Sequence, residues 1–254
     1  MQTLDRGGIT LAYQEAGTGD PPMVFIHGWT CDHTYFAPQF EHFKGSHRVV
    51  AVDLRGHGTS DKPEGEYPMT LFAEDVAAVL GQLDVEGAVV VGHSMGALVT
   101  VQLARSHPAL VSRAVLVDPA PMAVPPEIGA LLSQLTDNME GPDPVAARRV
   151  VIDMLFIPTD DPELKERVAN EMANAPAHVA VACFRGIGAF DGEDALGSLT
   201  IPVLVINSAA PINDPQRLAS LCPSLTNEHT PGVGHFNQLL APDEVNRLIA
   251  GFVG

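Results

Sequence analysis

The chain has few of the residues on which cross-linked, nucleic-acid-binding or membrane-spanning proteins depend. Three cysteines in 254 residues are too few and too scattered for a disulfide framework or a zinc knuckle. Lys and Arg number 14 against 31 Asp and Glu, a formal net charge of −17, so nucleic acids and anionic membranes are not expected partners. No apolar run is long enough to span a bilayer, and the first ten residues lack the apolar core of a signal peptide. A cytoplasmic location is therefore expected.

What the sequence does contain is a series of short apolar segments separated by helix-like stretches. Continuous Val, Ile and Leu runs are typical of parallel strands that are buried on both faces. Residues 9–15 alternate instead, which indicates an edge strand paired with an earlier one at residues 2–4. This order of strands and helices predicts an α/β fold with a doubly wound, mostly parallel sheet. The predicted internal strands are 23–26, 48–52, 88–91, 114–117 and 203–206, and the helices around them are 70–83, 96–106, 215–221 and 241–252.

Between Asp118 and Ile201 the sequence predicts helices and no strand. Prolines near the helix starts and the polar breaks E-G-P-D-P and P-T-D-D-P set the limits of these helices. An insertion of this size predicts a helical cap, or lid, over the carboxyl edge of the sheet. The chain then divides into an α/β core, residues 1–120 and 199–254, and a cap, residues 121–198. The predicted cap helices are 126–138, 144–155, 162–174 and 176–187.

Six apolar side chains of this insertion are candidates for the lining of a substrate pocket beneath the cap. The alternative is that they only pack the cap against the core. They are Met122, Met154, Leu155, Phe156, Phe184 and Phe190.

The segment V-V-V-G-H-S-M-G, residues 89–96, ends in the pattern G-x-S-x-G. A strand that enters a helix through so tight a turn forces its central residue into a strained conformation, and Gly92 and Gly96 make room for the turn. Such a nucleophile elbow exposes the hydroxyl of Ser94 at the carboxyl edge of the sheet, within reach of a base. Ser94 is therefore the predicted nucleophile.

A serine hydroxyl is a poor nucleophile at neutral pH and needs a base to take its proton. His235, in P-G-V-G-H-F, is the predicted base, because the glycines around it allow a loop that brings the imidazole over the sheet edge. The other nine histidines are less suited: His107 precedes a proline at a helix end, and His93 would point away from the serine. No pair of histidines has a metal-ligand spacing such as H-E-x-x-H, so no metal is expected.

Four motifs, in this order, give the chain a resemblance to the α/β-hydrolase family over nearly its whole length. They are F-I-H-G-W (25–29), D-L-R-G-H-G-T-S (53–60), G-H-S-M-G (92–96) and G-V-G-H-F (232–236). The family's triad order of nucleophile, acid and histidine fits this chain.

The resemblance also implies roles for residues beside the triad. In the family, the turn after the third strand supplies one amide of the oxyanion hole, and the residue after the nucleophile supplies the other. These are here the backbone N–H groups of Trp29 and Met95. His27, Arg55 and His57 would then have a structural role in shaping the loops.

The triad acid is where the sequence departs from the more common family pattern, an aspartate soon after the strand at 203–206. The chain continues N-S-A-A-P-I-N-D there, and Asp214 at its end is better placed to cap the following helix. Asp118 directly follows the strand at 114–117, and adjacent parallel strands lie ~5 Å apart, so its carboxylate could reach a histidine over Ser94. Certain lactone and ring-cleavage hydrolases, haloalkane dehalogenases and cofactor-free dioxygenases of the family place the acid at this strand end. Asp118 is the predicted acid, with Asp214, or a triad that lacks an acid, as alternatives.

These residues predict two-step acyl transfer through an acyl-enzyme on Ser94, with no metal or organic cofactor. The expected enzyme is a carboxylesterase or lactonase that hydrolyses a small, fairly apolar ester or lactone, or the amide or C–C analogues that relatives cleave. Its expected partner is this small-molecule substrate. The oligomeric state stays open, with a homodimer as one option.

Two other functions remain compatible with the sequence. A cofactor-free 2,4-dioxygenase would use the His235–Asp118 pair to deprotonate a heteroaromatic substrate, although such enzymes carry an additional histidine where this chain has Cys31. A small-molecule receptor of the same fold would keep the pocket without hydrolysis. The intact Ser94–His235 pair and both oxyanion turns favour an enzyme.

Overall fold

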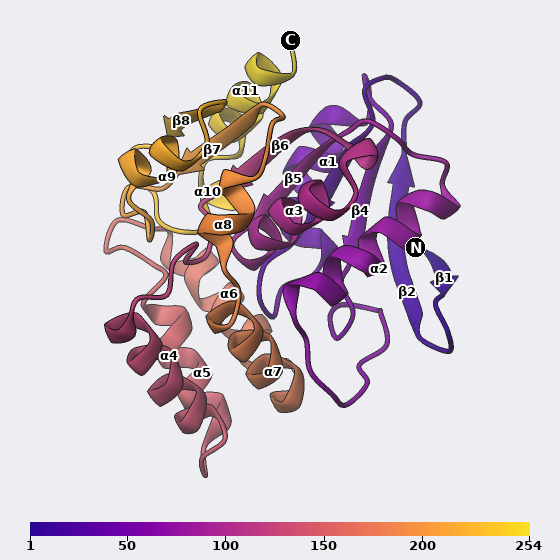
Figure 1. Ribbon diagram of the computed structural model, residues 1–254. Helices are drawn as coiled ribbons and strands as arrows, with labels where there is room; N and C mark the ends of the chain where they lie inside the picture. The colour runs from indigo at the N-terminus through magenta and orange to yellow at the C-terminus, as the bar shows by residue number, and fades with distance from the viewer.

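Eight strands form a single sheet at the centre of the protein in the computed structural model, which describes residues 1–254 (Figure 1). Their spatial order is β1-β2-β4-β3-β5-β6-β7-β8. β2 pairs antiparallel with both β1 and β4, and all other neighbours pair parallel, which confirms the predicted doubly wound, mostly parallel α/β sheet. The strands are β1 (Gln2–Asp5), β2 (Thr10–Ala16), β3 (Met23–Ile26), β4 (Val49–Asp53), β5 (Ala88–His93), β6 (Val111–Val117), β7 (Val203–Asn207) and β8 (Leu225–His229).

The internal strands match the continuous apolar runs of the sequence, because β3, β4, β5 and β7 are buried at every residue. β8 was not predicted. Its sequence, L-T-N-E-H, is mostly polar, and the strand lies exposed or half-buried at the edge of the sheet. An edge strand without an apolar run gives no periodic signal.

Helices cover both faces of the sheet (Figure 1). On one face α1 and α11 join the apolar cluster that contains Phe25 and Val91, and on the other α2 and α3 join the larger cluster that contains Val24 and Val90. None of the helices combines the length and apolarity needed to cross a bilayer. The core helices are η1 (His33–Phe36), α1 (Ala37–Phe43), α2 (Met69–Gln82), α3 (Met95–Ser106), η2 (Pro108–Leu110), α8 (Gly192–Gly197), α9 (Pro215–Leu221), α10 (Asn237–Leu240) and α11 (Pro242–Val253).

Five helices lie between β6 and β7 in the chain, and the first four of them gather at one end of the sheet (Figure 1). α5 packs against α4 and α6, and α4 packs against α7. These four are α4 (Pro126–Met139), α5 (Pro144–Asp153), α6 (Pro162–Ala173) and α7 (Ala177–Gly188). α8 falls within the predicted cap but packs on α3 and α9, so it is part of the core layer. The cap is therefore made of α4–α7 and the turns between them.

Candidate active site

Ser94 occupies a strained turn between β5 and α3. Its φ of 53° and ψ of −117° lie outside the regions that non-glycine residues normally adopt. The turn is held because the Ser94 N–H donates a hydrogen bond of 3.1 Å to the carbonyl of Val117. A side chain at Gly96 would overlap the carbonyl oxygens of Ile26 and His27, and one at Gly92 would overlap the carbonyl of Gly96. Both glycines are therefore required for the close packing that sets the turn.

Backbone strain is concentrated at the carboxyl ends of the central strands. Only four non-glycine residues have a positive φ, and three of them follow β3, β5 and β6 directly or within a few residues. These three are Thr30, Ser94 and Asp118, with φ values of 54°, 53° and 36°. Strained backbone of this kind collects at functional sites, where the surrounding structure holds it in place. The distribution supports this edge of the sheet as the candidate site.

The structure brings the predicted base and the predicted acid together. His235 Nδ1–H donates a hydrogen bond of 2.7 Å to Asp118 Oδ2, and the two side chains are only 4% and 1% exposed. The backbone N–H of Ser208, directly after β7, donates to the other carboxylate oxygen at 2.9 Å. Nε2 of the imidazole makes no hydrogen bond within the protein, so it is free to accept a proton.

His93, the residue before Ser94, packs against His235. Its Nε2–H donates a hydrogen bond of 3.0 Å to the carbonyl of His235, and the two rings lie 4.7 Å apart. Burial and the neighbouring His235 hold the pKa of His93 well below its usual range. His93 therefore stays neutral and fixes the backbone of the predicted base.

The two predicted oxyanion amides belong to segments that adjoin Ser94. A Cβ placed on Gly28 would lie 3.2 Å from the Cβ of Ser94, so the turn that carries Trp29 rests directly against the elbow. The Trp29 N–H makes no hydrogen bond within the protein. Met95 is the first residue of α3, and the first N–H groups of a helix have no partner inside it. Both amides are available to an oxygen atom bound near Ser94.

Asp214, the alternative acid, does not contact His235. Its carboxylate caps α9 by accepting a hydrogen bond of 2.9 Å from the N–H of Gln216, as the sequence suggested. The structure thus brings Asp118 and not Asp214 to the histidine. No group of three or more His, Cys, Asp or Glu side chains is arranged to hold a metal ion.

The candidate pocket residues separate into different environments. Phe184 packs on Trp29, with ring centroids 5.1 Å apart, and Phe156 stacks on Phe236 at 5.0 Å. These contacts bring both rings next to the candidate site and also pack the cap against the core. Leu155 is half-buried in the same turn as Phe156.

The other three candidate pocket residues, Met154, Met122 and Phe190, make none of these contacts beside the candidate site. The prediction for Met154 is not supported, because it follows the last turn of α5 and its side chain is 62% exposed. Met122 is buried in the core, and Met122 and Phe190 both border a cavity of about 420 Å³ where the cap joins the core. Neither Ser94 nor His235 lines that cavity.

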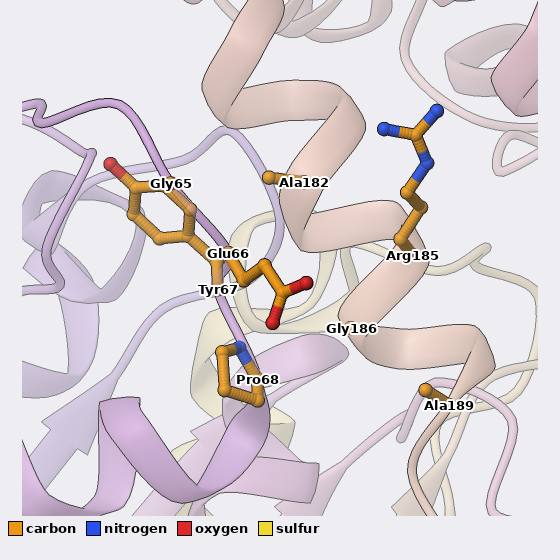
Figure 2. Close-up of a pocket in the computed structure, with 8 residues that line it drawn as sticks. All are labelled: Gly65, Glu66, Tyr67, Pro68, Ala182, Arg185, Gly186 and Ala189. Atoms are coloured by element: carbon orange, nitrogen blue, oxygen red, sulfur yellow. The ribbon is translucent and has the colours of Figure 1, made fainter.

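A cavity of about 260 Å³ lies between α7 and the segment that precedes α2 (Figure 2). In Figure 2 the carboxylate of Glu66 extends toward α7, and the guanidinium of Arg185 points away from Glu66. Arg185 forms an ion pair with Glu140. Gly186 allows the close approach of α7, because a Cβ there would overlap the carbonyl of Tyr67. This cavity is separate from the residues around Ser94.

The motif residues with an expected structural role, His27, Arg55 and His57, are held by buried or partly buried hydrogen bonds. His27 Nδ1–H donates to the carbonyl of Gly28, and its Nε2 accepts from the N–H of Leu54. Burial lowers the pKa of His57 to about 3. Arg55 forms two hydrogen bonds, of 2.7 and 2.8 Å, with the carboxylate of Asp75, which is itself buried.

Cys31 is the residue for which the dioxygenase alternative predicts a histidine. Its thiol is buried and donates a hydrogen bond to the carbonyl of Trp29. Burial and the nearby Asp32 raise its pKa well above the usual range, so it stays a neutral thiol. The nearest histidine in the sequence, His33, pairs with Asp53, and this hydrogen bond raises the pKa of His33.

Comparison with known proteins identifies the class. A sequence profile described as the alpha/beta hydrolase fold matches residues 21–242. The chain belongs to the alpha/beta hydrolase fold family, and with this fold and these likenesses it is a hydrolase.

Three relatives illustrate the likeness. The 2-(acetamidomethylene)succinate hydrolase of Mesorhizobium japonicum is 30% identical over 271 residues, which cover 98% of this chain and 94% of the relative. A thermophilic esterase from Thermogutta terrifontis superimposes with a TM-score of 0.89 at 25% identity, over 100% of this chain and 98% of the esterase. Est816, described as an N-acyl homoserine lactone degrading enzyme, has a TM-score of 0.87 at 29% identity, over 99% and 100% of the two chains.

Proposed function

We propose that the protein is a serine hydrolase that cleaves a small, fairly apolar carboxylic ester or lactone through an acyl-enzyme on Ser94. The observation that carries this proposal is the buried hydrogen bond of 2.7 Å from His235 to Asp118. It orients the imidazole with Nε2 unprotonated, which is the form that accepts a proton from a hydroxyl.

In the first half of the proposed reaction, Ser94 Oγ gives its proton to His235 Nε2 and attacks the carbonyl carbon. The N–H groups of Trp29 and Met95 donate hydrogen bonds to the developing oxyanion, and each lowers the barrier by about 3 kcal/mol. The imidazolium, stabilised by Asp118, then donates its proton to the leaving oxygen, and the C–O bond breaks.

In the second half, a water molecule repeats these steps. His235 takes a proton from the water, whose oxygen attacks the acyl carbon and releases the carboxylic acid. The proton returns from His235 to Ser94 Oγ, which restores the starting state. These steps use only groups of the chain and water.

The substrate class is supported by the side chains around the site and by the relatives. The rings of Trp29, Phe156 and Phe184 offer an apolar surface to an acyl or alkoxy group. An esterase and a lactone-degrading enzyme are among the solved structures of similar fold at 25% identity or more.

The test is release of nitrophenol from short-chain nitrophenyl esters by the wild-type protein and Ser94→Ala, purified side by side. Turnover that is lost in Ser94→Ala supports the proposal, and the preferred chain length then measures the room beneath the cap. Equal turnover in the two proteins would exclude Ser94 as the nucleophile. Absence of turnover in the folded wild type, with lactones tried as well, would reject the ester and lactone class.

A further inference from the structure

A second buried carboxylate joins the cap to the loop of His235. Asp160 lies in the turn between α5 and α6, and it is 8% exposed. Its Oδ1 accepts a hydrogen bond of 2.8 Å from the N–H of Gly234, the residue before the histidine. Its Oδ2 accepts one of 2.9 Å from the N–H of Ile157, in its own turn. One side chain therefore holds a cap residue and a core-loop residue at the same time.

The same cap turn makes further contacts with the histidine loop. The carbonyl of Leu155 accepts a hydrogen bond of 3.1 Å from the N–H of His235 itself. The hydroxyl of Thr159 donates to the carbonyl of Gly232 at 3.3 Å. With the stacking of Phe156 on the residue after the histidine, these contacts hold the loop on both sides of His235.

The identity of residue 234 follows from this contact. A Cβ on Gly234 would overlap Asp160 Oδ2 and lie 3.2 Å from the carbonyl oxygen of Leu155. Any side chain would push the cap turn away from the histidine loop. Glycine at this position therefore permits the carboxylate to approach the backbone closely.

The core and the cap hold different atoms of His235. Core residues hold the imidazole Nδ1, through Asp118, and the carbonyl oxygen, through His93. The cap holds the N–H of His235 through Leu155 and the preceding N–H through Asp160. If the cap turn moves away, two backbone donors lose their acceptors and the imidazole keeps only its core contacts.

We propose that Asp160 is a positioning residue that couples the cap to the catalytic histidine. It acts through His235 and does not touch substrate, and this role rests on the proposed function. His235 is then correctly placed over Ser94 only while the cap turn is docked, so that hydrolysis depends on the closed position of the cap.

The test uses Asp160→Asn, which keeps the size of the side chain but replaces one acceptor oxygen with an NH₂ donor facing a backbone N–H. Its control is Asp161→Asn, the same change one residue later. Asp161 is the exposed N-terminal capping residue of helix α6, a position at which asparagine is as favourable as aspartate. For both variants we would measure thermal unfolding, kcat and KM on a short-chain nitrophenyl ester, and amide hydrogen exchange of the peptide that contains residues 232–236.

We expect faster exchange in that peptide for Asp160→Asn, and a roughly 10- to 100-fold lower kcat with KM changed by less than about threefold. Asp161→Asn should match the wild type in all three. A folded Asp160→Asn with wild-type exchange and kcat would overturn the proposal, as would an equal loss in Asp161→Asn.

A measurement on the wild-type protein keeps the proposal testable if Asp160→Asn does not fold. The amides of Ile157 and Gly234 should open as one unit, with equal protection against exchange. Independent protection of the two would contradict the coupling. If the wild type proves to have no esterase activity, the proposed function fails, whereas the exchange measurements still decide whether Asp160 couples the cap to the histidine loop.

Discussion

The backbone N–H of Ser208 donates a hydrogen bond of 2.9 Å to Oδ1 of Asp118. The loop after β7, where the family more commonly carries its acid, thus supplies a hydrogen-bond donor to Asp118, the predicted acid, which directly follows the neighbouring strand β6. Asp118 is 1% exposed and accepts hydrogen bonds at both oxygens, one from Ser208 and one from His235. A buried carboxylate satisfied in this way holds the imidazole in a fixed orientation.

Replacement of this acid should separate it from the alternative. Asp118→Asn removes the negative charge and leaves the imidazole without its acceptor, so we expect kcat for ester hydrolysis to fall by about 10⁴-fold. Asp214 is the exposed N-terminal capping residue of helix α9, and asparagine is equally favourable at such a position. Asp214→Asn should therefore leave kcat within about twofold of the wild type.

Steady-state kinetics on one nitrophenyl ester, with both variants shown to be folded by circular dichroism, measures the difference. A large loss in Asp214→Asn, with Asp118→Asn near wild type, would reverse the assignment of the acid.

Replacement of a glycine by alanine should lower stability at the elbow and raise it in an open part of the cap. Gly96→Ala would press a methyl group into the carbonyl oxygens of Ile26 and His27, so the free energy of unfolding should fall by about 3 kcal/mol or more. Gly129→Ala lies within α4, where the new Cβ meets only a side-chain atom at 3.7 Å, and should raise it by about 0.5–1 kcal/mol. Urea unfolding of both proteins gives the comparison, and a Gly96→Ala protein as stable as Gly129→Ala would refute this account of the turn.

The contact between Trp29 and Phe184 should make tryptophan fluorescence a probe of the cap. Trp29 is the single tryptophan, it is 4% exposed, and its indole N–H donates to the carbonyl of Ala180 in α7. Phe184→Ala should lower the free energy of unfolding by about 3 kcal/mol and increase quenching of Trp29 by acrylamide. Val150→Ala, at an exposed position of α5, should change stability by less than about 0.5 kcal/mol and leave quenching unaltered. Unchanged quenching in Phe184→Ala would show that the ring does not shield the indole.

Buried neutral histidines should make the protein less stable in acid. Burial lowers the pKa of His57 to about 3 and holds that of His93 well below its usual range, whereas both titrate near ~6.5 in the unfolded chain. Below that pH the unfolded chain binds protons that the folded protein does not. The free energy of unfolding should therefore be constant above about pH 6.5, as far as these groups are concerned, and fall by about 1.4 kcal/mol per pH unit for each of them below it.

Urea unfolding at a series of pH values below about 6.5 measures how steeply the free energy of unfolding falls with pH. His57→Asn should reduce this slope by about 1.4 kcal/mol per pH unit, the contribution of one proton. A slope that is the same in His57→Asn and wild type would show that this histidine is not held neutral by the fold.

The fold could be predicted from the sequence wherever a strand or helix has its own periodic signal. The apolar runs at β3 and β7 predicted the bounds of these strands to within one residue, and α9 begins and ends as predicted. β8 was missed because an edge strand can be polar, and α8 was assigned to the cap because the chain gives no sign of which layer a short helix joins.

The site could be predicted only where local sequence determines geometry. The elbow at Ser94 and the glycine-flanked His235 follow from neighbouring residues, and Asp118 follows from the adjacency of two strand ends. Asp160 was interpreted as part of a polar break, because its partner, Gly234, lies 74 residues away in the chain. Met154 was placed among the pocket candidates for its apolarity, although its position at the end of α5 directs it to solvent.

The central claim, that Ser94 is a nucleophile activated by His235, is tested most directly by covalent labelling. The wild-type protein, Ser94→Ala and His235→Ala are incubated with an alkyl fluorophosphonate, and the adduct is mapped by peptide mass spectrometry. We predict one phosphonyl group on the peptide that contains Ser94, none on that peptide in Ser94→Ala, and labelling slowed by orders of magnitude in His235→Ala. An adduct on another residue, or a folded wild-type protein that remains unlabelled, would contradict the account.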